Sequence, residues 1–279
     1  MSEGSGLRSL NAAIRGLANR FTAPDNALRR ALSPAYSSVL SALTRGRGYP
    51  AEINGQVFRI DPRFRWRVTH AHERAVAEYL QRNVKPGQTC FDVGANVGVY
   101  VLQLARWCAP HGRVIAFEPN PSTIPVLEKH ITMNGPDARV TLVPKGAGAQ
   151  SGTAALFDDV AGSGLSRIGG PHPAIEAAVT PRTIPVTTID EYCRETGIVP
   201  DWMLIDVEGY EYEVLQGAAD TLRRHRPGIV MELHPHVLSE ESRAAGERLL
   251  RALGLEIVPL AEVEGRQETF VTVVASGVR

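Results

Sequence analysis

The chain has 279 residues, of which 43% are hydrophobic and 22% charged, values typical of a globular protein that can bury a sizeable core. Its 30 basic and 30 acidic side chains balance, so it lacks the basic excess that nucleic-acid-binding proteins use against phosphates. This composition argues against a disordered chain and against a nucleic-acid partner.

Residues 1–48 are expected to form an N-terminal helical extension or cap. Apolar residues from Leu7 to Leu17 recur at helical spacing, and Pro24 and Pro34 interrupt the pattern farther on. Three interpretations stay open: a cap over an active site, an arm that forms a homodimer, or a poorly ordered tail.

Residues 49–279 are expected to form one large domain. A hairpin around Asn54-Gly55 spans Ala51–Ile60, and a helix follows at His72–Asn83. Strands are then predicted at Thr89–Val93, Arg113–Phe117, Val140–Val143, Trp202–Val207, Gly228–Leu233, Glu256–Pro259 and Thr269–Ala275. Helices are predicted between them at Val97–Trp107, Pro121–Met133, Tyr212–Arg224 and Ser239–Leu253. This alternation predicts an α/β fold with a doubly wound, mostly parallel sheet.

An inserted segment at about 158–182 interrupts the alternation. Strands are predicted on either side of it, at Gly152–Phe157 and Thr183–Val186, but the segment itself is rich in Gly, Pro, Ser and Ala. Long irregular loops inside compact domains are usually functional, so we expect a lid-like loop over a substrate.

Three cysteines, Cys90, Cys108 and Cys193, are too few and too scattered for a disulfide framework or a zinc site, so buried thiols are expected. The first 20 residues lack the apolar core of a secretory signal, and no stretch approaches the roughly 18 apolar residues of a membrane span. We therefore expect a cytoplasmic protein without a transmembrane segment.

A glycine-rich turn, Gly94-Ala95-Asn96-Val97-Gly98, joins the first strand of the alternation to its helix. Ligands of open α/β sheets bind at the carboxyl ends of the strands, where such a turn lies, and amides at the start of the helix can face the ligand. The dinucleotide fingerprint G-x-G-x-x-G needs glycine where the chain has Asn96 and Val99. The turn therefore suits a cofactor without a pyrophosphate, the alternative being a turn that holds no ligand.

Glu118 ends the second strand, 24 positions after Gly94. An acidic residue at this point can accept hydrogen bonds from both hydroxyls of a ribose. Pro119 keeps the backbone extended beyond it. Without the glycine turn, a lone Glu at a strand end would be interpreted as solvated.

A second group of polar residues follows two later strands: Asp206, Glu208, Glu232 and His234. Neighbouring strand ends would bring them together, with Asp206 and Glu208 on one side of an extended chain, and Glu232 and His234 likewise. The group could bind an acceptor, supply a base, or hold a hard divalent cation on Asp206, Glu232 and His234. The alternative is that these residues only cap helices and sheet edges.

Four segments together resemble the FkbM family of methyltransferases. They are Phe91-Asp92-Val93-Gly94-Ala95-Asn96-Val97-Gly98, Phe117-Glu118-Pro119-Asn120-Pro121, Thr188-Ile189-Asp190 and Ile205-Asp206-Val207-Glu208-Gly209. The resemblance covers roughly residues 70–235. It implies a Rossmann-like class I methyltransferase fold, S-adenosylmethionine as the methyl donor, and a small-molecule acceptor, usually a hydroxyl on a sugar or another natural product.

The resemblance also implies roles for single residues. Asp92, Gly94, Asn96 and Gly98 would contact the methionine part of the cofactor, Glu118 its ribose, Lys145 and Gly146 its adenine, and Glu73 its ammonium group. We count Ala95, Pro119 and Asp206 among the cofactor-binding residues as well. One departure concerns Leu204, which stands where FkbM relatives often have lysine and so puts a direct transfer of their acceptor chemistry in doubt.

The expected reaction is O-methylation. An alcohol must lose its proton when it attacks, and we expect His234 to act as the base, oriented by Asp206 or Glu232, with Asp206 acting directly as the second option. The alternatives are a nitrogen or carboxylate acceptor at the same cofactor site, or a non-catalytic protein that binds a nucleotide. A nicotinamide oxidoreductase is disfavoured by Asn96 and Val99.

Overall fold

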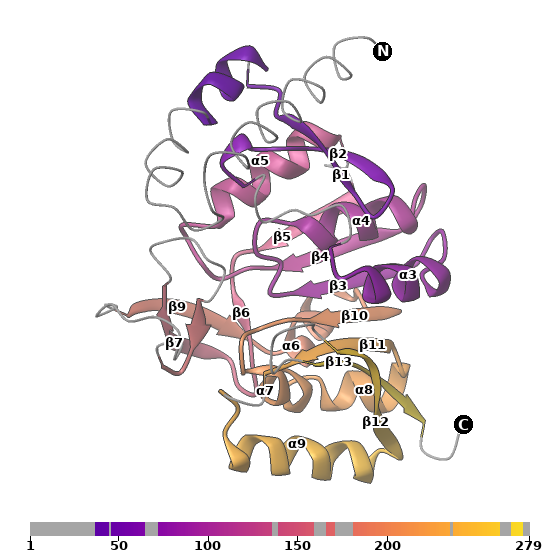
Figure 1. Ribbon diagram of the computed structural model, residues 1–279. Helices are drawn as coiled ribbons and strands as arrows, with labels where there is room; N and C mark the ends of the chain where they lie inside the picture. The colour runs from indigo at the N-terminus through magenta and orange to yellow at the C-terminus, as the bar shows by residue number, and fades with distance from the viewer. Residues whose placement is uncertain are drawn as a thin grey trace. The chain divides into compact units, whose positions relative to one another are not determined.

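The computed structural model describes residues 37–44, 46–64, 72–135, 139–158, 166–170, 181–234, 237–262 and 269–275 (Figure 1). The helical pattern expected between Leu7 and Leu17 lies outside these residues. The chain divides into two compact units, Met1–His72 and Glu73–Arg279.

The first unit contains the predicted hairpin. Strands β1 (Tyr49–Ile53) and β2 (Gln56–Ile60) pair antiparallel, with Ile53 opposite Gln56. Asn54 and Gly55 both have positive φ, 47° and 76°, as a two-residue hairpin turn requires. The hairpin is therefore confirmed and begins two residues earlier than expected. The short helix η1 (Pro62–Phe64) follows it.

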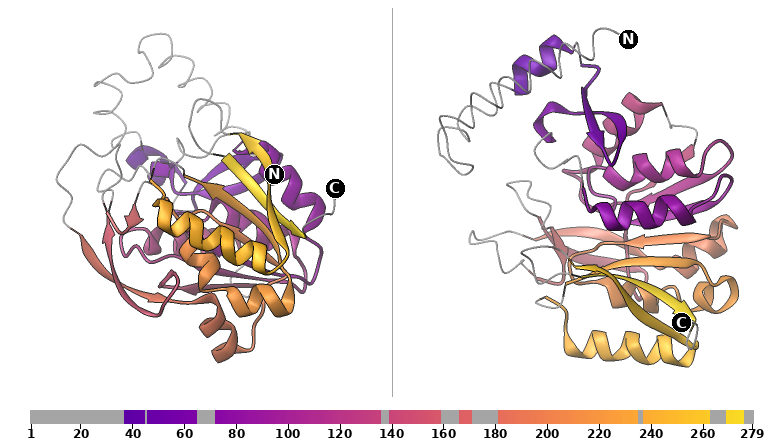
Figure 2. Two further views of the ribbon diagram at one scale, coloured as in Figure 1. Left: turned by 90° about the horizontal axis from the view of Figure 1, so that it is seen from below. Right: turned by 45° about the vertical axis from the view of Figure 1, so that its right-hand side comes forward.

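The second unit is built on the expected sheet. Among its described residues, seven strands follow the order β12-β13-β11-β10-β3-β4-β5 (Figures 1 and 2). Their bounds are β3 (Thr89–Val93), β4 (Arg113–Phe117), β5 (Val140–Val143), β10 (Trp202–Ile205), β11 (Gly228–Leu233), β12 (Leu255–Glu262) and β13 (Thr269–Ala275). Strands β11, β10, β3, β4 and β5 are parallel, and β13 pairs antiparallel with β11 and β12. The strand order reverses between β3 and β10, so the doubly wound, mostly parallel sheet is confirmed.

Helices cover both faces of this sheet. Cys90 packs with helices α3 (Arg74–Asn83), α4 (Val99–Trp107) and α5 (Ile124–Asn134), whereas its neighbour Phe91 packs with the opposite group. That group comprises α6 (Ile189–Thr196), α7 (Glu211–Gln216), α8 (Ala219–His225) and α9 (Glu240–Ala252). Successive residues of a strand point to opposite faces, so each strand of the sheet contributes to two apolar clusters.

Two predictions about local structure need correction. The helix expected over Tyr212–Arg224 is two helices, α7 and α8, and the Gly217 carbonyl oxygen between them accepts a hydrogen bond from the Asp190 amide at 2.9 Å. A Cβ at Gly217 would lie 2.0 Å from the Gly148 carbonyl oxygen, so glycine is needed there. The strand expected to end at Val207 ends at Ile205. Helix α6 was not predicted, although Thr188 caps it by accepting a hydrogen bond from the Glu191 amide.

A smaller sheet flanks the inserted segment. Its described strands follow the order β6-β9-β7-β8, with β6 (Gly146–Ala147), β7 (Gly152–Phe157), β8 (Arg167–Ile168) and β9 (Arg182–Thr187). The two strands predicted on either side of the segment are present as β7 and β9, and they pair antiparallel with Ala154 opposite Ile184. Strand β8 is an unpredicted element within 158–182. Residues 159–165 and 171–180 of the expected loop lie outside the described residues.

Two further observations bear on the sequence predictions. All three cysteines lie in described ranges and are free and buried. In the part of the chain that the structure describes, no helix combines the length and the apolar character needed to cross a membrane.

Candidate active site

The glycine turn, residues 94–98, follows β3, the strand at which the strand order of the sheet reverses. The amides of Gly94 and Ala95 both donate to the Phe117 carbonyl oxygen at 3.0 Å, which fastens the turn to the end of β4. Gly94 has φ 90°, and a Cβ there would lie 1.8 Å from the backbone oxygen of Asp206. Gly94 is therefore required both for its conformation and for the close approach of the chain that carries Asp206.

Glu118 holds the other side of this turn. Its two carboxylate oxygens accept hydrogen bonds from the amides of Asn96, at 2.7 Å, and Asn120, at 2.8 Å. Burial raises the pKa of Glu118 to about 7; the two amides oppose this shift, and the charges of Asp158 and Asp206 add to it. Each oxygen keeps a further lone pair, so a ribose diol can still donate to Glu118.

Asp92 presents a buried carboxylate beside the turn. It is 3% exposed, and its Oδ2 has no hydrogen-bond partner among the described residues. Burial raises its pKa to about 8, with the charges of Asp206, Glu118 and Glu73 contributing. A buried acceptor with no partner suits a ligand that brings a donor or a positive charge, as the methionine part of S-adenosylmethionine does. The residues present therefore fit this cofactor.

The remaining residues expected at the cofactor lie at different places. Glu73 has φ 42° just before α3, and its side chain hydrogen-bonds Tyr100 and raises the pKa of that phenol, with burial as the larger cause. Pro119 is half-buried beside Glu118. Lys145 is exposed, whereas Gly146 is buried in β6.

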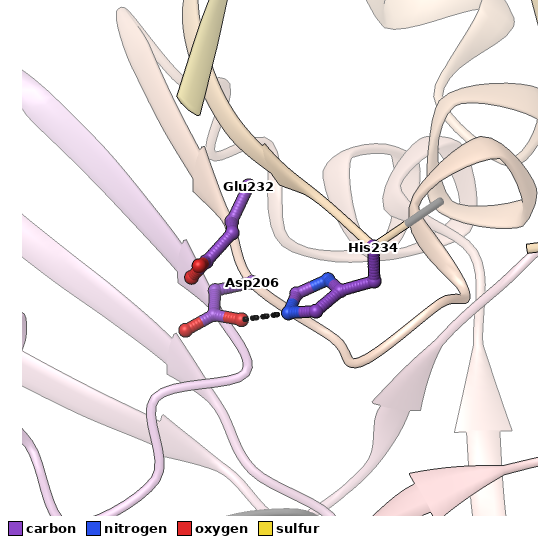
Figure 3. Close-up of side chains that lie close together, drawn as sticks. All are labelled: Asp206, Glu232 and His234. Carbon is purple, nitrogen blue, oxygen red and sulfur yellow. Dashed lines mark ion pairs between the residues drawn. The ribbon is translucent and has the colours of Figure 1, made fainter. Parts of the chain in front are cut away.

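The second predicted group also comes together (Figure 3). One ligand atom from each of Asp206, Glu232 and His234 lies within 4.8 Å of the others, and these residues are called the carboxylate–histidine cluster below. Asp206 follows β10, and Glu232 lies on β11, at the next step of a register that pairs Ile205 with Met231. The cluster thus stands at the carboxyl edge of two adjacent parallel strands.

His234 is held by a residue that the sequence analysis missed. Its Nδ1 lies 2.7 Å from Oε1 of Glu211, a fully buried side chain at the start of α7. Its Nε2 faces Asp206 Oδ1 at 3.9 Å and Glu208 Oε2 at 3.4 Å. Glu211 therefore makes a short contact that can orient the ring.

These carboxylates determine the charge of the imidazole. Burial on its own lowers the pKa of His234, but the hydrogen bond to Glu211 and the charges of Asp206, Glu211 and Glu208 outweigh it and raise the pKa to about 10. This arrangement favours the imidazolium near neutral pH. Asp206 is the accessible member of the cluster, with a side chain 40% exposed against 2% for His234.

Two other groups near the site gave no motif in the sequence. The Asn120 side chain donates to Asp158 Oδ1 at 2.7 Å, which connects the Glu118 loop to the end of β7. Arg167 on β8 donates to the backbone oxygens of Glu208 and Val237, each at 3.1 Å. Both contacts join residues far apart in the chain. Leu204, at the position of the family's lysine, is 2% exposed in an apolar cluster.

Comparison with known proteins decides the family. The model of the FkbM methyltransferase domain matches residues 92–254, more than half of the chain. The chain belongs to the FkbM family of methyltransferases. It is therefore an S-adenosylmethionine-dependent methyltransferase, and the resemblance seen in the sequence is confirmed.

The individual proteins to which the chain is similar are distant in sequence. The hexuronic acid methyltransferase AglP of Haloferax volcanii is 29% identical over 178 residues, which cover 62% of this chain and 67% of AglP. An FkbM methyltransferase of Methylobacillus flagellatus is similar in structure at 18% identity and a TM-score of 0.49; the match covers 76% of this chain and 54% of that one. A fibrillarin of Aeropyrum pernix with bound S-adenosylmethionine matches at 15% identity and a TM-score of 0.45, covering 72% of this chain and 74% of that one.

Proposed function

We propose that this protein transfers the methyl group of S-adenosylmethionine to a hydroxyl of a sugar or another natural product. The observation that carries the proposal is the contact of Gly94 with the backbone of Asp206, where a Cβ would lie only 1.8 Å away. This contact brings the glycine turn and the carboxylate–histidine cluster close together. A donor on the turn and an acceptor at the cluster would then meet across a short distance.

On the cofactor side, the proposed contacts are those of the glycine turn and the two buried carboxylates. Asp92 would accept from the methionine part and Glu118 from the ribose, with Gly94, Ala95, Asn96, Gly98 and Pro119 forming the backbone around them. Glu73, Lys145 and Gly146 complete the proposed set. Two amide hydrogen bonds already fix Glu118 before a ligand binds, so little order has to be gained on binding.

On the acceptor side, Asp206 is the group that an incoming hydroxyl would meet first, since Glu232 and His234 are 5% and 2% exposed. We assign to Asp206 the acceptance of the hydroxyl hydrogen bond and of its proton. Glu232 and His234 provide further polar groups around the hydroxyl oxygen. The bound sulfonium supplies an electrophilic methyl group, so the protein's main contribution is alignment, which can remove up to roughly 7–11 kcal/mol of a barrier.

The donor is tested by calorimetry with S-adenosylhomocysteine and, separately, with NAD. We expect S-adenosylhomocysteine to bind and NAD not to bind, because Asn96 and Val99 replace two glycines of the dinucleotide fingerprint. Radiolabelled S-adenosylmethionine with a panel of sugars and glycosides then tests the acceptor. Stronger binding of NAD, or no label transferred to any hydroxyl compound, would contradict the proposal.

A carboxylate acceptor is the second candidate. Arg167 places a guanidinium beside the Glu208 backbone, and AglP is named for hexuronic acids, which carry both hydroxyls and a carboxylate. The panel should therefore include glucuronic acid beside glucose. Alkali removes a methyl ester but not a methyl ether, so the lability of the labelled product shows which oxygen accepted the methyl group.

A further inference from the structure

The carboxylate–histidine cluster has the composition of a metal site. We propose that Asp206, Glu232 and His234 bind one divalent cation at the carboxyl edge of the sheet. Two carboxylates and one imidazole are ligands that Mn²⁺, Fe²⁺ and Zn²⁺ accept in proteins.

The distances are those of a site that closes by a small movement. The three ligand atoms lie within 4.8 Å of one another. Two ligand atoms at about 2.1 Å from one ion lie about 3.0 Å apart at adjacent corners of an octahedron and about 3.4 Å apart at corners of a tetrahedron. Side-chain movements on the order of 1 Å would therefore bring the three atoms to bonding distance of one ion.

The two ends of the histidine ring have separate partners. Nδ1 contacts Glu211. Because the Glu211 carboxylate also accepts a hydrogen bond from the Gly209 amide at 2.8 Å, the ring is held on its Nδ1 side. Nε2 is thereby turned toward Asp206 (Figure 3). The second ring nitrogen of a metal-binding histidine usually donates its N–H to a carboxylate, a carbonyl or a water. Glu208, whose Oε2 lies 3.4 Å from Nε2, is placed to contribute a further oxygen.

Charge at this edge also favours a cation. Asp206, Glu208, Glu211 and Glu232 gather around one imidazole. Arg167 donates two of its N–H groups to backbone oxygens, and its charge interacts with Glu208 and Glu211, so one guanidinium faces four carboxylates. A bound cation would balance the negative charge. If the proposed function is correct, on which this role rests, the cation would also hold the acceptor oxygen beside the methyl group.

The test measures Mn²⁺ alone. The full chain is freed of metal with a chelator and titrated with Mn²⁺, and the free ion is followed by electron paramagnetic resonance. We expect one site in the parent. Glu232→Gln should weaken it at least about tenfold, and Glu211→Gln, which disturbs the ring's support, by about 10–100-fold. Glu128→Gln, an exposed residue on α5, is the matched control and should bind as the parent does.

Folding is checked independently by circular dichroism and by S-adenosylhomocysteine binding of each variant. A parent that binds no Mn²⁺, or folded variants that bind it equally, would overturn the cation site. Mn²⁺ bound through the cluster without methylation of any hydroxyl would overturn the proposed function and support the site. Methylation of a hydroxyl by a protein that has been freed of metal and binds no Mn²⁺ would overturn the cation site and support the proposed function.

Discussion

The two halves of the site are constructed differently. The half around Gly94 and Glu118 is built mainly from backbone: amides held by one carboxylate and a glycine that no other residue can replace. The half around Asp206 and His234 is built from side chains that come from two strands and a helix. We therefore expect the first half to be sensitive mainly to the shape of the backbone and the second half mainly to charge. Substitutions in the first half should affect donor binding, and substitutions in the second half should affect methyl transfer.

The largest expected effect is that of Gly94→Ala. The added methyl group would collide with the Asp206 backbone at a φ of 90°, at a cost on the order of 3 kcal/mol. We expect S-adenosylhomocysteine affinity to fall by at least about 100-fold, measured by calorimetry, together with a lower melting temperature.

Gly87→Ala is the matched control for that prediction. Gly87 also has φ 90°, but nothing lies within 4 Å of its Cβ position. It shares the conformational strain without the collision, so it should keep the affinity of the parent. Equal losses in both variants would mean that the close approach to Asp206 does not matter.

His234→Gln tests the independence of the second half. Glutamine can still donate to Glu211, but it removes the imidazole nitrogen that faces Asp206. Turnover should fall about 100-fold, the lower range for a lost proton-transfer or positioning group, while S-adenosylhomocysteine affinity stays within about twofold. Turnover within threefold of the parent's, in a folded variant, would remove His234 from the reaction.

We expect binding of the methyl donor to depend on pH through the ionisation of Glu118. Its pKa of about 7 lies above the ordinary carboxyl value, and a ribose needs the ionised form as acceptor. Protonated Glu118 therefore weakens binding as the pH falls below 7. The advantage of the parent over Glu118→Gln in S-adenosylhomocysteine affinity should grow by about tenfold per pH unit up to about 7 and then level off.

The comparison with Glu118→Gln isolates this carboxyl from its neighbours. Asp92, Asp158 and Asp206 also affect its charge, each from a different segment, and they are present in both proteins. Calorimetry at several pH values between 5.5 and 8.5 gives the ratio of affinities. A ratio that does not change with pH would show that Glu118 is already ionised throughout.

The smallest expected effect is that of Asp158→Asn. The charge of Asp158 raises the pKa of Glu118, so its removal should move the midpoint of the pH dependence downward by a few tenths of a unit. The Asn120 side chain can still donate to the new amide oxygen. The same calorimetric series measures the shift, and an upward movement would contradict the assigned cause.

Local patterns in the sequence were sufficient for most of the fold and for the donor half. Strands β3, β4, β5, β11 and β13 have the predicted bounds. The first four are buried parallel strands, which are short apolar runs ended by turn residues. The glycine turn and Glu118 are also recognisable locally, since each acts through its own backbone or at a strand end. The errors occur where distant segments meet, as at Gly217, whose carbonyl oxygen between α7 and α8 accepts a hydrogen bond from the distant Asp190 amide.

Only the tertiary structure decided the partners of the second half. The sequence placed Asp206, Glu232 and His234 at neighbouring strand ends, but no motif or spacing indicated Glu211. Folding buries Glu211 against His234 and thereby sets the direction and the charge of the ring. Such contacts depend on how a helix packs on a sheet, and no spacing within one segment of the chain encodes that packing.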